Sequence, residues 1–340
     1  MCINSKLFFA FILTKLLIAP TAVDAKSKHK GKEADVESTG VQSASLWRDP
    51  VDITSRNLLY GAGGEKHQPH TTYTFVKEDL DGTNPKFVVR DENDVKWKVK
   101  MGEEARPETA ASRLVWSVGY FTDEDYFVKD LQVQNMPAHL HRGQKLVDSD
   151  GSVHNVRLKR ELPGEKKIGV WKWRTDPFSQ TRELNGLRVM MALINNWDLK
   201  DENNAIHEHK GEKIYLVSDL GASFGTPGAD FPHSKAKGNL QSYSRSKFMT
   251  KTTSEYVDFQ EPARPSLRYV FNLHEYFQRR GMEWIGRHVP RTDAAWMGQL
   301  LNRLSAEQIG DAFRAAGYSP DEVQGFSAVV TRRIAALNAL

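Results

Sequence analysis

Apolar and polar residues alternate in the first ordered stretch of the chain. Apolar side chains recur at every second position in three short runs, at 73–75, 87–89 and 95–99. Polar segments rich in Asp, Asn and Gly, at 79–85 and 91–94, separate these runs. A period of two is typical of half-buried strands, and short polar connections favour antiparallel neighbours. The pattern therefore predicts three antiparallel strands joined by tight turns.

The pattern changes to helical spacing at 103–118, where apolar residues recur three and four positions apart. Strand-like runs follow at 126–133, 153–160 and 168–174, and a second helical pattern covers 182–196. Four further helices are expected at 269–280, 295–304, 306–316 and 320–337. A strand-rich first half that leads into a helix-rich second half predicts an α+β fold with two lobes.

The N-terminus has the pattern of an export signal. Lys6 precedes an apolar run at 7–20, and Lys15 interrupts the run. This stretch is too short to span a membrane comfortably, so it is typical of a cleavable signal peptide over residues 1–25, although an N-terminal core helix is an alternative. Residues 26–46 are rich in Lys, Glu, Ser and Gly and are predicted to be a disordered tether. We expect an exported protein, periplasmic or extracellular, without a transmembrane anchor after signal removal.

Composition narrows the class of protein. The 340 residues include 47 Lys and Arg against 43 Asp and Glu, a net charge of +4, which argues against a dedicated nucleic-acid-binding surface. The only cysteine, Cys2, lies inside the predicted signal peptide, so the mature chain would have no disulfide. Its stability must then come from an ordinary hydrophobic core, which a chain of this length can form.

Two polar motifs in the middle of the chain contain the candidate chemistry. The hexapeptide Asp-Leu-Lys-Asp-Glu-Asn occupies 198–203, and Asp-Leu-Gly occupies 219–221, at the end of the apolar run 214–217. Carboxylate and amide oxygens are the ligands that Mg²⁺ and Mn²⁺ prefer. A phosphoryl group in transfer spreads negative charge over its oxygens, so its site needs a fixed cation and a metal more than it needs a nucleophile. The two motifs therefore predict a metal and phosphate site.

The order and spacing of these motifs resemble the protein-kinase-like superfamily, and especially atypical members such as HipA-type toxin kinases, secretory-pathway kinases and lipid-kinase-like folds. The hexapeptide resembles a catalytic loop, and 219–221 resembles the metal-binding loop with Leu in place of Phe. Upstream, Trp-Lys-Val-Lys at 97–100 resembles the strand that carries the phosphate-binding lysine. Glu108, at the start of the next predicted helix, resembles the carboxylate that pairs with this lysine.

The resemblance implies a two-lobed kinase-like fold. Its strand-rich N-lobe would cover residues 47–135, and its mainly helical C-lobe would cover 136–340, with a basic β-hairpin inserted near 153–175. The resemblance also implies ATP or another nucleotide, with Mg²⁺ or Mn²⁺, and an acceptor that is an unknown protein, lipid or glycan. The Ser- and Gly-rich segment 222–264 is either a mobile acceptor-binding element or an ordinary long loop.

The resemblance further implies a role for individual side chains. Asp198 would align and deprotonate the acceptor, and Lys200 would steady the transferring phosphate. Lys100 would contact the nucleotide phosphates, with Glu108 as its ion-pair partner. Gly82 and Thr83 would belong to a phosphate-covering loop, and Asn203 and Asp219 would be metal ligands. Lys98 lies on the same strand face as Lys100, so the strand register decides which lysine points inward.

Departures from the kinase pattern keep other functions open. Asn196-Trp197 replaces the usual His-Arg, and the predicted covering loop has a single glycine. One alternative is therefore a catalytically inactive kinase-like scaffold that binds a cell-envelope partner through the basic, Trp-containing hairpin. Another is a zinc-dependent hydrolase, because histidines occur in closely spaced pairs. Its candidate ligands are His139, His141, His154, His207 and His209.

Overall fold

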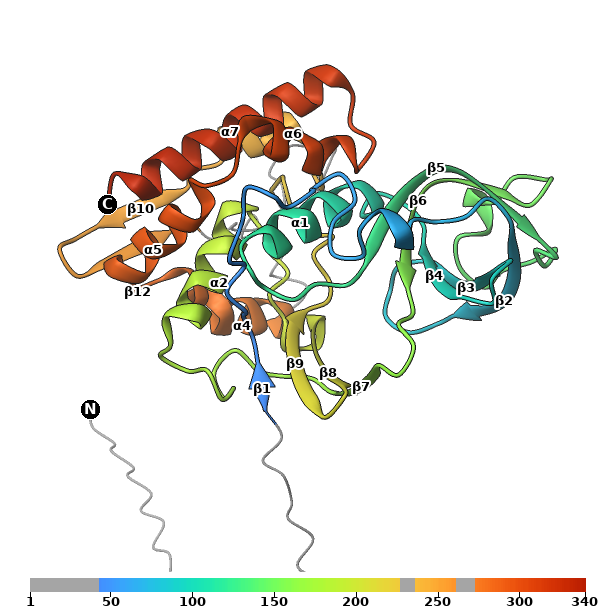
Figure 1. The fold of residues 1–340 in the computed structure, drawn as a ribbon, viewed down its shortest axis with the longest axis horizontal. Coiled ribbons are helices and arrows are strands. Elements are labelled where there is room, and N and C mark those ends of the chain that lie inside the picture. The colour runs from blue at the N-terminus through green and yellow to red at the C-terminus, as the bar shows by residue number, and fades with distance from the viewer. Residues whose placement is uncertain (1–42, 227–235, 261–272) are drawn as a thin grey trace, which may run out of the picture. The chain divides into compact units, whose positions relative to one another are not determined.

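The computed structural model describes residues 43–226, 236–260 and 273–340 (Figure 1). The predicted signal peptide, 1–25, and the greater part of the predicted tether lie outside these residues. Within them, no helix has both the length and the apolar sequence that a membrane crossing needs. The described chain is a mixed α+β protein with a strand-rich N-terminal region and a helical C-terminal region.

The tether ends earlier than predicted. Ala44–Ser45 form strand β1, which pairs in parallel with β9 (Glu212–Val217). The next residue, Leu46, is 2% exposed and belongs to the hydrophobic core. Backbone pairing and burial of one leucine therefore order the last residues of a segment whose composition is otherwise polar.

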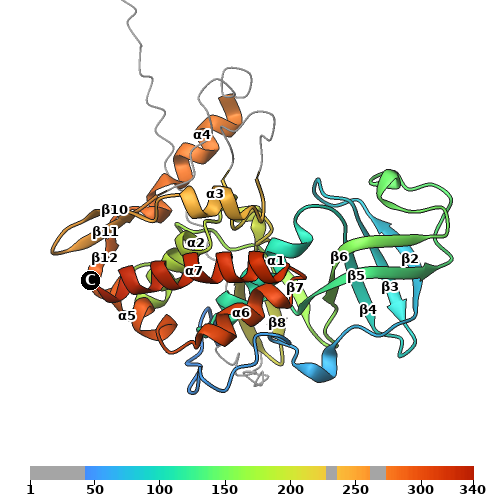
Figure 2. The same ribbon diagram turned by 90° about the horizontal axis from the view of Figure 1, so that it is seen from above.

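Five strands form a closed barrel in the N-terminal region, and Figure 2 shows them gathered together. In the order of their pairing they are β2 (Tyr73–Asp79), β3 (Lys86–Asp91), β4 (Lys96–Lys100), β6 (Ser152–Arg160) and β5 (Asp125–Gln134). Neighbours run antiparallel except β2 and β5, which close the barrel in parallel. The three predicted antiparallel strands, β2 to β4, are confirmed. Alternation explains this result, because Phe87, Trp97 and Val99 point into the barrel and are at most 1% exposed.

Helix α1 (Ala105–Ser117) follows β4 and confirms the helix predicted at 103–118. It contacts β5 and β6 of the barrel and also α6 (Ala306–Arg314). Nearly all of its side chains are buried, including the charged Glu108 and Arg113. A buried charge needs a partner, so this helix is a place where an ion-pair network has to form.

The C-terminal region is built mainly from helices around one hydrophobic core. Its helices are α2 (Arg182–Leu193), α3 (Leu240–Arg245), α4 (Leu273–Met282), α5 (Arg291–Leu301), α6 and α7 (Pro320–Asn338). Short 3₁₀ turns occur in both regions of the chain. They are η1 (Glu65–His67) and η2 (Gln144–Leu146) in the strand-rich region, and η3 (Asp201–Asn203) and η5 (Glu283–Gly286) in the helical region. The helices predicted for this region are confirmed, although residues 269–272 of the helix predicted at 269–280 lie outside the described residues. Helices α6 and α7 both begin at capping boxes, where Ser305 and Ser319 accept a hydrogen bond from the first turn.

Two small sheets complete the described chain. The first has the strand order β1-β9-β8-β7, with β8 (Asn204–His209) and β7 (Lys166–Gly169), and β8 and β9 form a hairpin. The second has the order β10-β11-β12, with strands Met249–Thr252, Tyr256–Phe259 and Val289–Pro290. The described parts of the predicted long loop, 222–264, therefore contain α3, β10 and β11 and are more regular than a loop.

The predicted basic hairpin near 153–175 is wrong. β6 pairs with β4 and β5 in the barrel, whereas β7 pairs with β8 in a different sheet. Only the first two residues of the predicted strand 168–174 are in β7, and Trp171 and Trp173 are buried in the helical core. The apolar residues of β6 face the barrel interior, so the strand-rich region continues past residue 135 to Arg160.

Candidate active site

Strand β4 presents two lysines on the outer face of the barrel. Lys98 and Lys100 alternate with Trp97 and Val99, which point into the barrel. Lys100 is 3% exposed, whereas the Lys98 side chain is 39% exposed and lies 3.3 Å from Asp79. The register therefore leaves both lysines on one face, and Lys100 is the buried one.

Three carboxylates surround the Lys100 ammonium. Its Nζ lies 2.6 Å from Glu104 Oε2, 2.9 Å from Glu108 Oε2 and 3.2 Å from Asp219 Oδ1. Burial alone would lower the pKa of Lys100, but these carboxylates, Glu108 first, raise it above its ordinary value. The charged lysine thus links β4 to the start of α1 and to the loop after β9.

A second layer of charges balances the carboxylates. Arg157 on β6 donates to Glu108 Oε1 at 3.0 Å and lies 3.4 Å from Asp125 Oδ1, and Lys237 pairs with Glu104. Burial raises the pKa of Asp125 to about 7, which Arg157 only partly offsets. With Asp125 protonated, three cations face three carboxylates, so the network is neutral. Such a network can stay buried because every charge has a partner.

The loop after β9 holds its aspartate in a tight turn. Asp219 Oδ1 accepts a hydrogen bond from the backbone N–H of Gly221 at 3.1 Å. Burial would raise the pKa of Asp219, but Lys100 and this hydrogen bond lower it below its ordinary value. A Cβ atom on Gly221 would lie 2.7 Å from the Cβ of Glu104, so only glycine fits here. The Asp-Leu-Gly motif therefore packs directly against the residue that precedes α1.

The hexapeptide motif lies against the same loop. The backbone N–H groups of Ser218 and Asp219 donate to the Asn203 carbonyl at 2.8 and 3.2 Å. The Asn203 side chain donates to the Asp198 carbonyl at 2.6 Å, and Lys200 Nζ lies 3.3 Å from Asp198 Oδ1. These contacts place the two polar motifs of the sequence side by side.

Asn196 and Trp197, which replace the His-Arg of the kinase pattern, support the hexapeptide. Asn196 is 2% exposed, and its Oδ1 accepts a hydrogen bond from the Asp198 backbone N–H at 2.9 Å. The Trp197 backbone N–H donates to the Ala222 carbonyl at 3.2 Å. A buried amide therefore fixes the start of the hexapeptide, and the next residue ties it to the Asp219 loop.

One cavity of about 800 Å³ brings these elements together. Its wall includes all eight residues that the sequence singled out. They are Asp198, Lys200, Lys100, Glu108, Gly82, Thr83, Asn203 and Asp219. Gly82 and Thr83 come from the turn between β2 and β3, where Gly82 has a φ of 64°, a conformation that favours glycine. Separate stretches of the chain thus meet at one site.

Two sets of side chains in this cavity are candidate metal ligands. Oxygens of Glu104, Glu108 and Asp219 lie within 4.8 Å of one another, but the Lys100 ammonium contacts all three and already supplies the positive charge. The second set is Asn203 and Asp219. Asn203 uses its amide nitrogen for Asp198, and no described residue forms a hydrogen bond with Asp219 Oδ2. An amide oxygen and a carboxylate oxygen that line one cavity are ligands suited to Mg²⁺ or Mn²⁺.

Sequence reasoning assigned no role to several residues of this site. They are Glu104, Arg157 and Lys237. Acidic residues are common at helix starts because of the helix dipole, so nothing in the sequence separated Glu104 from Glu103. Arg157 shares the outer face of β6, which alternation could have indicated. Lys237 lies in a polar segment without periodicity, so no sequence signal identified it.

The histidines of the zinc-hydrolase alternative do not assemble into a metal site. His154 lies between two exposed aspartates, at 2.7 and 2.8 Å. His141 pairs with Glu78 and His207 pairs with Glu165, both at 3.0 Å. In the described part of the chain, the only group of three imidazole or carboxylate side chains at metal-binding spacing is the carboxylate trio around the lysine ammonium. Nothing therefore supports the hydrolase.

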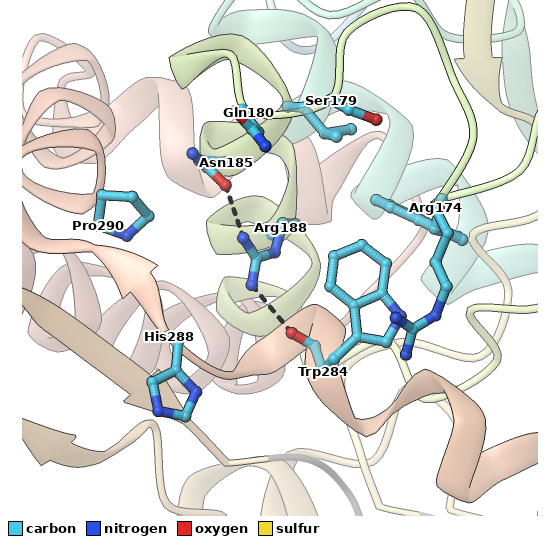
Figure 3. Close-up of a pocket in the computed structure, with 10 residues that line it drawn as sticks. Arg174, Ser179, Gln180, Asn185, Arg188, Trp284, His288 and Pro290 are labelled. Atoms are coloured by element: carbon cyan, nitrogen blue, oxygen red, sulfur yellow. Dashed lines mark hydrogen bonds between the residues drawn. The ribbon is translucent and has the colours of Figure 1, made fainter.

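A second cavity, of about 360 Å³, lies beside α2 and shares no lining residue with the candidate site (Figure 3). Arg188 of α2 donates to Asn185 Oδ1 at 2.6 Å. It also donates to the carbonyls of Trp284 and Ile285, at 2.9 and 2.8 Å. Arg174 lies over the Trp284 ring, 4.7 Å from its centroid. These contacts connect α2 to η5. They explain the positions of Arg174 and Arg188 as structural, so no ligand needs to be invoked for this cavity.

The sequence matches no protein-family model and no curated protein. Among solved structures, the chain is similar to the Helicobacter pylori proinflammatory kinase CtkA, with 10% identity, a TM-score of 0.45, and coverage of 80% of this chain and 98% of that one. It is also similar to the Golgi casein kinase, with 11% identity, a TM-score of 0.29, and coverage of 78% and 73%. For the same kinase with Mn/ADP bound, the values are 11%, 0.28, 79% and 75%. Similarities this low do not indicate a function. Any functional assignment must rest on the geometry of the candidate site.

Proposed function

We propose that the protein is a phosphotransferase of the kinase type, with a two-lobed kinase-like fold and a site for a nucleotide with Mg²⁺ or Mn²⁺. The observation that carries this proposal is the ion pair between Lys100 and Glu108, with Asp219 joined to the same ammonium. Lys100 and Asp219 are 119 positions apart in the sequence but 3.2 Å apart in space. A lysine positioned by a helix carboxylate beside a metal-binding aspartate is what a phosphoryl-transfer site needs.

Three residues of the hexapeptide, Asp198, Lys200 and Asn203, and Asp219 of the following loop take part in this proposal. Asn203 and Asp219 hold the metal, which supplies positive charge to the phosphate oxygens when it is bound. Lys100, which lies 3.2 Å from Asp219, places a fixed positive charge beside the same phosphates. Asp198 accepts the proton of an acceptor hydroxyl, and Lys200, 3.3 Å away, holds a positive charge beside it.

The turn between β2 and β3 takes the covering role. A Cβ atom on Gly82 would meet only the tip of Lys86, at 3.9 Å, so the backbone at Gly82 is open to the approach of a phosphate. Thr83 adds a hydroxyl at the same rim of the cavity. This turn therefore offers backbone and side-chain donors to a ligand.

The export pattern at 1–25 supports the further proposal that the protein acts in the periplasm or outside the cell, on a protein, lipid or glycan that carries a hydroxyl group. The inactive-scaffold alternative needed an exposed aromatic hairpin. Trp171 and Trp173 are at most 3% exposed, and the hairpin does not form. The surface on which the scaffold alternative depended, an exposed hairpin with tryptophans, is therefore not present.

Ligand binding tests the proposal directly. ATP with Mn²⁺ should raise the unfolding temperature, because a ligand at 100 times its Kd stabilises the folded state by about 2.7 kcal/mol. Asp219→Ala should abolish this response. Asp198→Asn should keep the response but lose transfer of labelled phosphate, since it leaves the metal ligands in place.

A matched control is Asp321→Ala, which changes an exposed aspartate at the start of α7 and should leave both readouts intact. An unchanged thermal response to ATP and Mn²⁺ in the Asp219→Ala protein would contradict the proposal.

A further inference from the structure

The barrel side of the cavity is a wall of basic side chains on the outer faces of adjacent strands. Its members are Lys86 on β3, Lys98 and Lys100 on β4, and Arg157 and Lys159 on β6. The register makes like charges direct cross-strand neighbours, because Lys98 faces Lys159, and Lys100 faces Lys86 on one side and Arg157 on the other. Like charges directly opposite each other destabilise a sheet. The stability of the barrel therefore does not explain this wall.

Two lysines of the cavity have no carboxylate partner in the described chain. Lys98 and Lys159 each pair with an aspartate, at 3.3 and 2.6 Å. Among the described residues, no carboxylate lies at ion-pair distance from Lys86 on β3 or Lys167 on β7, although both line the cavity. Burial lowers the pKa of both lysines, and neighbouring lysines, including Lys98, lower it further, while Asp79 near Lys86 and Asp123 and Asp81 near Lys167 offset only part of this. An anion bound in the cavity would supply the missing negative charge.

The cavity offers little surface to a nucleoside base. Of the described residues that line it, only Trp197 and Ala222 have apolar side chains, and they are 5% and 6% exposed. The same part of the wall has eight Lys and Arg side chains against six carboxylates. Slots for flat organic ligands are lined mainly by apolar and aromatic side chains, whereas ammonium and guanidinium groups bind phosphate. The wall therefore favours phosphate groups over a ring.

We propose that this cavity selects its phosphoryl donor by a chain of phosphates and not by a nucleoside base, so that an inorganic polyphosphate binds as tightly as ATP. The inference rests on the proposed function, since it names the donor class of the same site. Lys100 places its positive charge beside the phosphates nearest to the metal ligands, and Lys86, Lys98 and Lys167 bind the phosphates further along the polyphosphate.

The transfer step is the same whether the phosphoryl donor is ATP or an inorganic polyphosphate. The terminal phosphorus–oxygen anhydride bond breaks, and the oxygen of an acceptor hydroxyl forms the new bond to phosphorus. The shortened polyphosphate, or ADP when ATP is the donor, leaves with the bonding electron pair, and the hydroxyl proton passes to Asp198.

Calorimetry on the whole protein with Mn²⁺ tests the inference by comparing tripolyphosphate, ATP, GTP, CTP and adenosine. Tripolyphosphate should bind with a Kd no higher than that of ATP, and it should compete with ATP for one site. The three nucleotides should agree within about threefold in Kd, because their bases make no selective contact. Adenosine should not bind at the same concentrations.

Two variants test whether tripolyphosphate binds to the basic side chains of the cavity. Lys86→Ala and Lys167→Ala should each weaken tripolyphosphate binding about tenfold, because each removes one charge-assisted contact. Neither should lower the unfolding temperature, since neither breaks an ion pair. Lys166→Ala is the matched control, because Lys166 is exposed on the same strand but does not line the cavity.

The outcomes separate this inference from the proposed function. If ATP with Mn²⁺ binds but tripolyphosphate does not compete, or if the nucleotides differ by more than about tenfold in Kd, the inference is overturned and the phosphotransferase proposal stands. An equal loss of binding in Lys166→Ala would show unspecific attraction to a basic surface and would also overturn it. If neither ATP nor tripolyphosphate binds, the proposed function itself fails.

Discussion

The two faces of strands β4 and β6 contribute different things to this protein. The inner face carries Trp97, Val99 and Leu158, which are at most 1% exposed and stabilise the barrel by burying apolar surface. The outer face carries Lys100 and Arg157, which are held in place by ion pairs with carboxylates and not by packing. The same strands therefore serve the fold and the candidate site through separate interactions. Single substitutions should be able to separate the two contributions.

The largest effect is expected from loss of the central ammonium. Lys100→Met keeps the aliphatic stem but leaves Glu104, Glu108 and Asp219 facing one another without a cation. Breaking a buried ion pair by removing one partner costs about 3–5 kcal/mol. We expect a loss of this size in the free energy of unfolding, measured by urea denaturation, and no thermal response to ATP with Mn²⁺. A variant as stable as the wild type would show that the ammonium does not hold the carboxylates.

The inner face should respond differently. Leu158 is fully buried in the barrel, and Leu158→Ala should lower the free energy of unfolding by about 3 kcal/mol, because it leaves a cavity in the core. At a temperature where the variant is folded, calorimetry should give an unchanged Kd for ATP with Mn²⁺. A weaker Kd would mean that the core and the site are coupled, and the separation between the two faces would fail.

Much of the fold follows from periodicity and from the order of motifs. The alternation at 87–89 and 95–99 placed β3 and β4, and it also put Lys98 and Lys100 on one face. The motifs at 198–203 and 219–221 were predicted to share a site, and both line the same cavity. These features are local in the sequence or follow from strand geometry, so they could be predicted without coordinates.

Other features depend on tertiary contacts and left no local signal. Helix α3 has six residues and β12 has two, which is too short for a periodic pattern to show. The strand predicted at 153–160 was placed in a hairpin with the run that follows it, whereas it pairs with the preceding strand β5 and with the more distant β4. Glu104 and Lys237 meet across 133 positions, a pairing that no spacing rule indicates.

Asp125, which lies 3.4 Å from Arg157, should make the free energy of unfolding depend on pH through the charges of the outer face. Burial raises the pKa of Asp125 to about 7 from an ordinary value of 3.8. Between these values the folded protein keeps a proton that the unfolded chain has lost, so the free energy of unfolding falls as the pH rises from about 4 to 7. The slope is at most about 1.4 kcal/mol per pH unit, and Asp125→Asn should remove it.

Urea denaturation at several pH values in this window checks the slope. The wild type and Leu158→Ala should share it, because the inner-face change leaves the charges in place, whereas Asp125→Asn should be flatter. Parallel curves for the wild type and Asp125→Asn would show that the carboxyl group titrates near its ordinary pKa.

The smallest effect is expected at Lys98, on the same face as Lys100. Its side chain is 39% exposed, and its partner Asp79 also accepts a hydrogen bond from the Asp81 backbone N–H at 3.0 Å, so the aspartate keeps a partner when the lysine is removed. Exposed ion pairs contribute about 0–1 kcal/mol, and Lys98→Ala should lower the free energy of unfolding by no more than this in urea. A loss as large as that of Lys100→Met would mean that burial does not distinguish the two lysines. The outer face would then be a single cooperative charge network, and its members could not be treated as separate ion pairs.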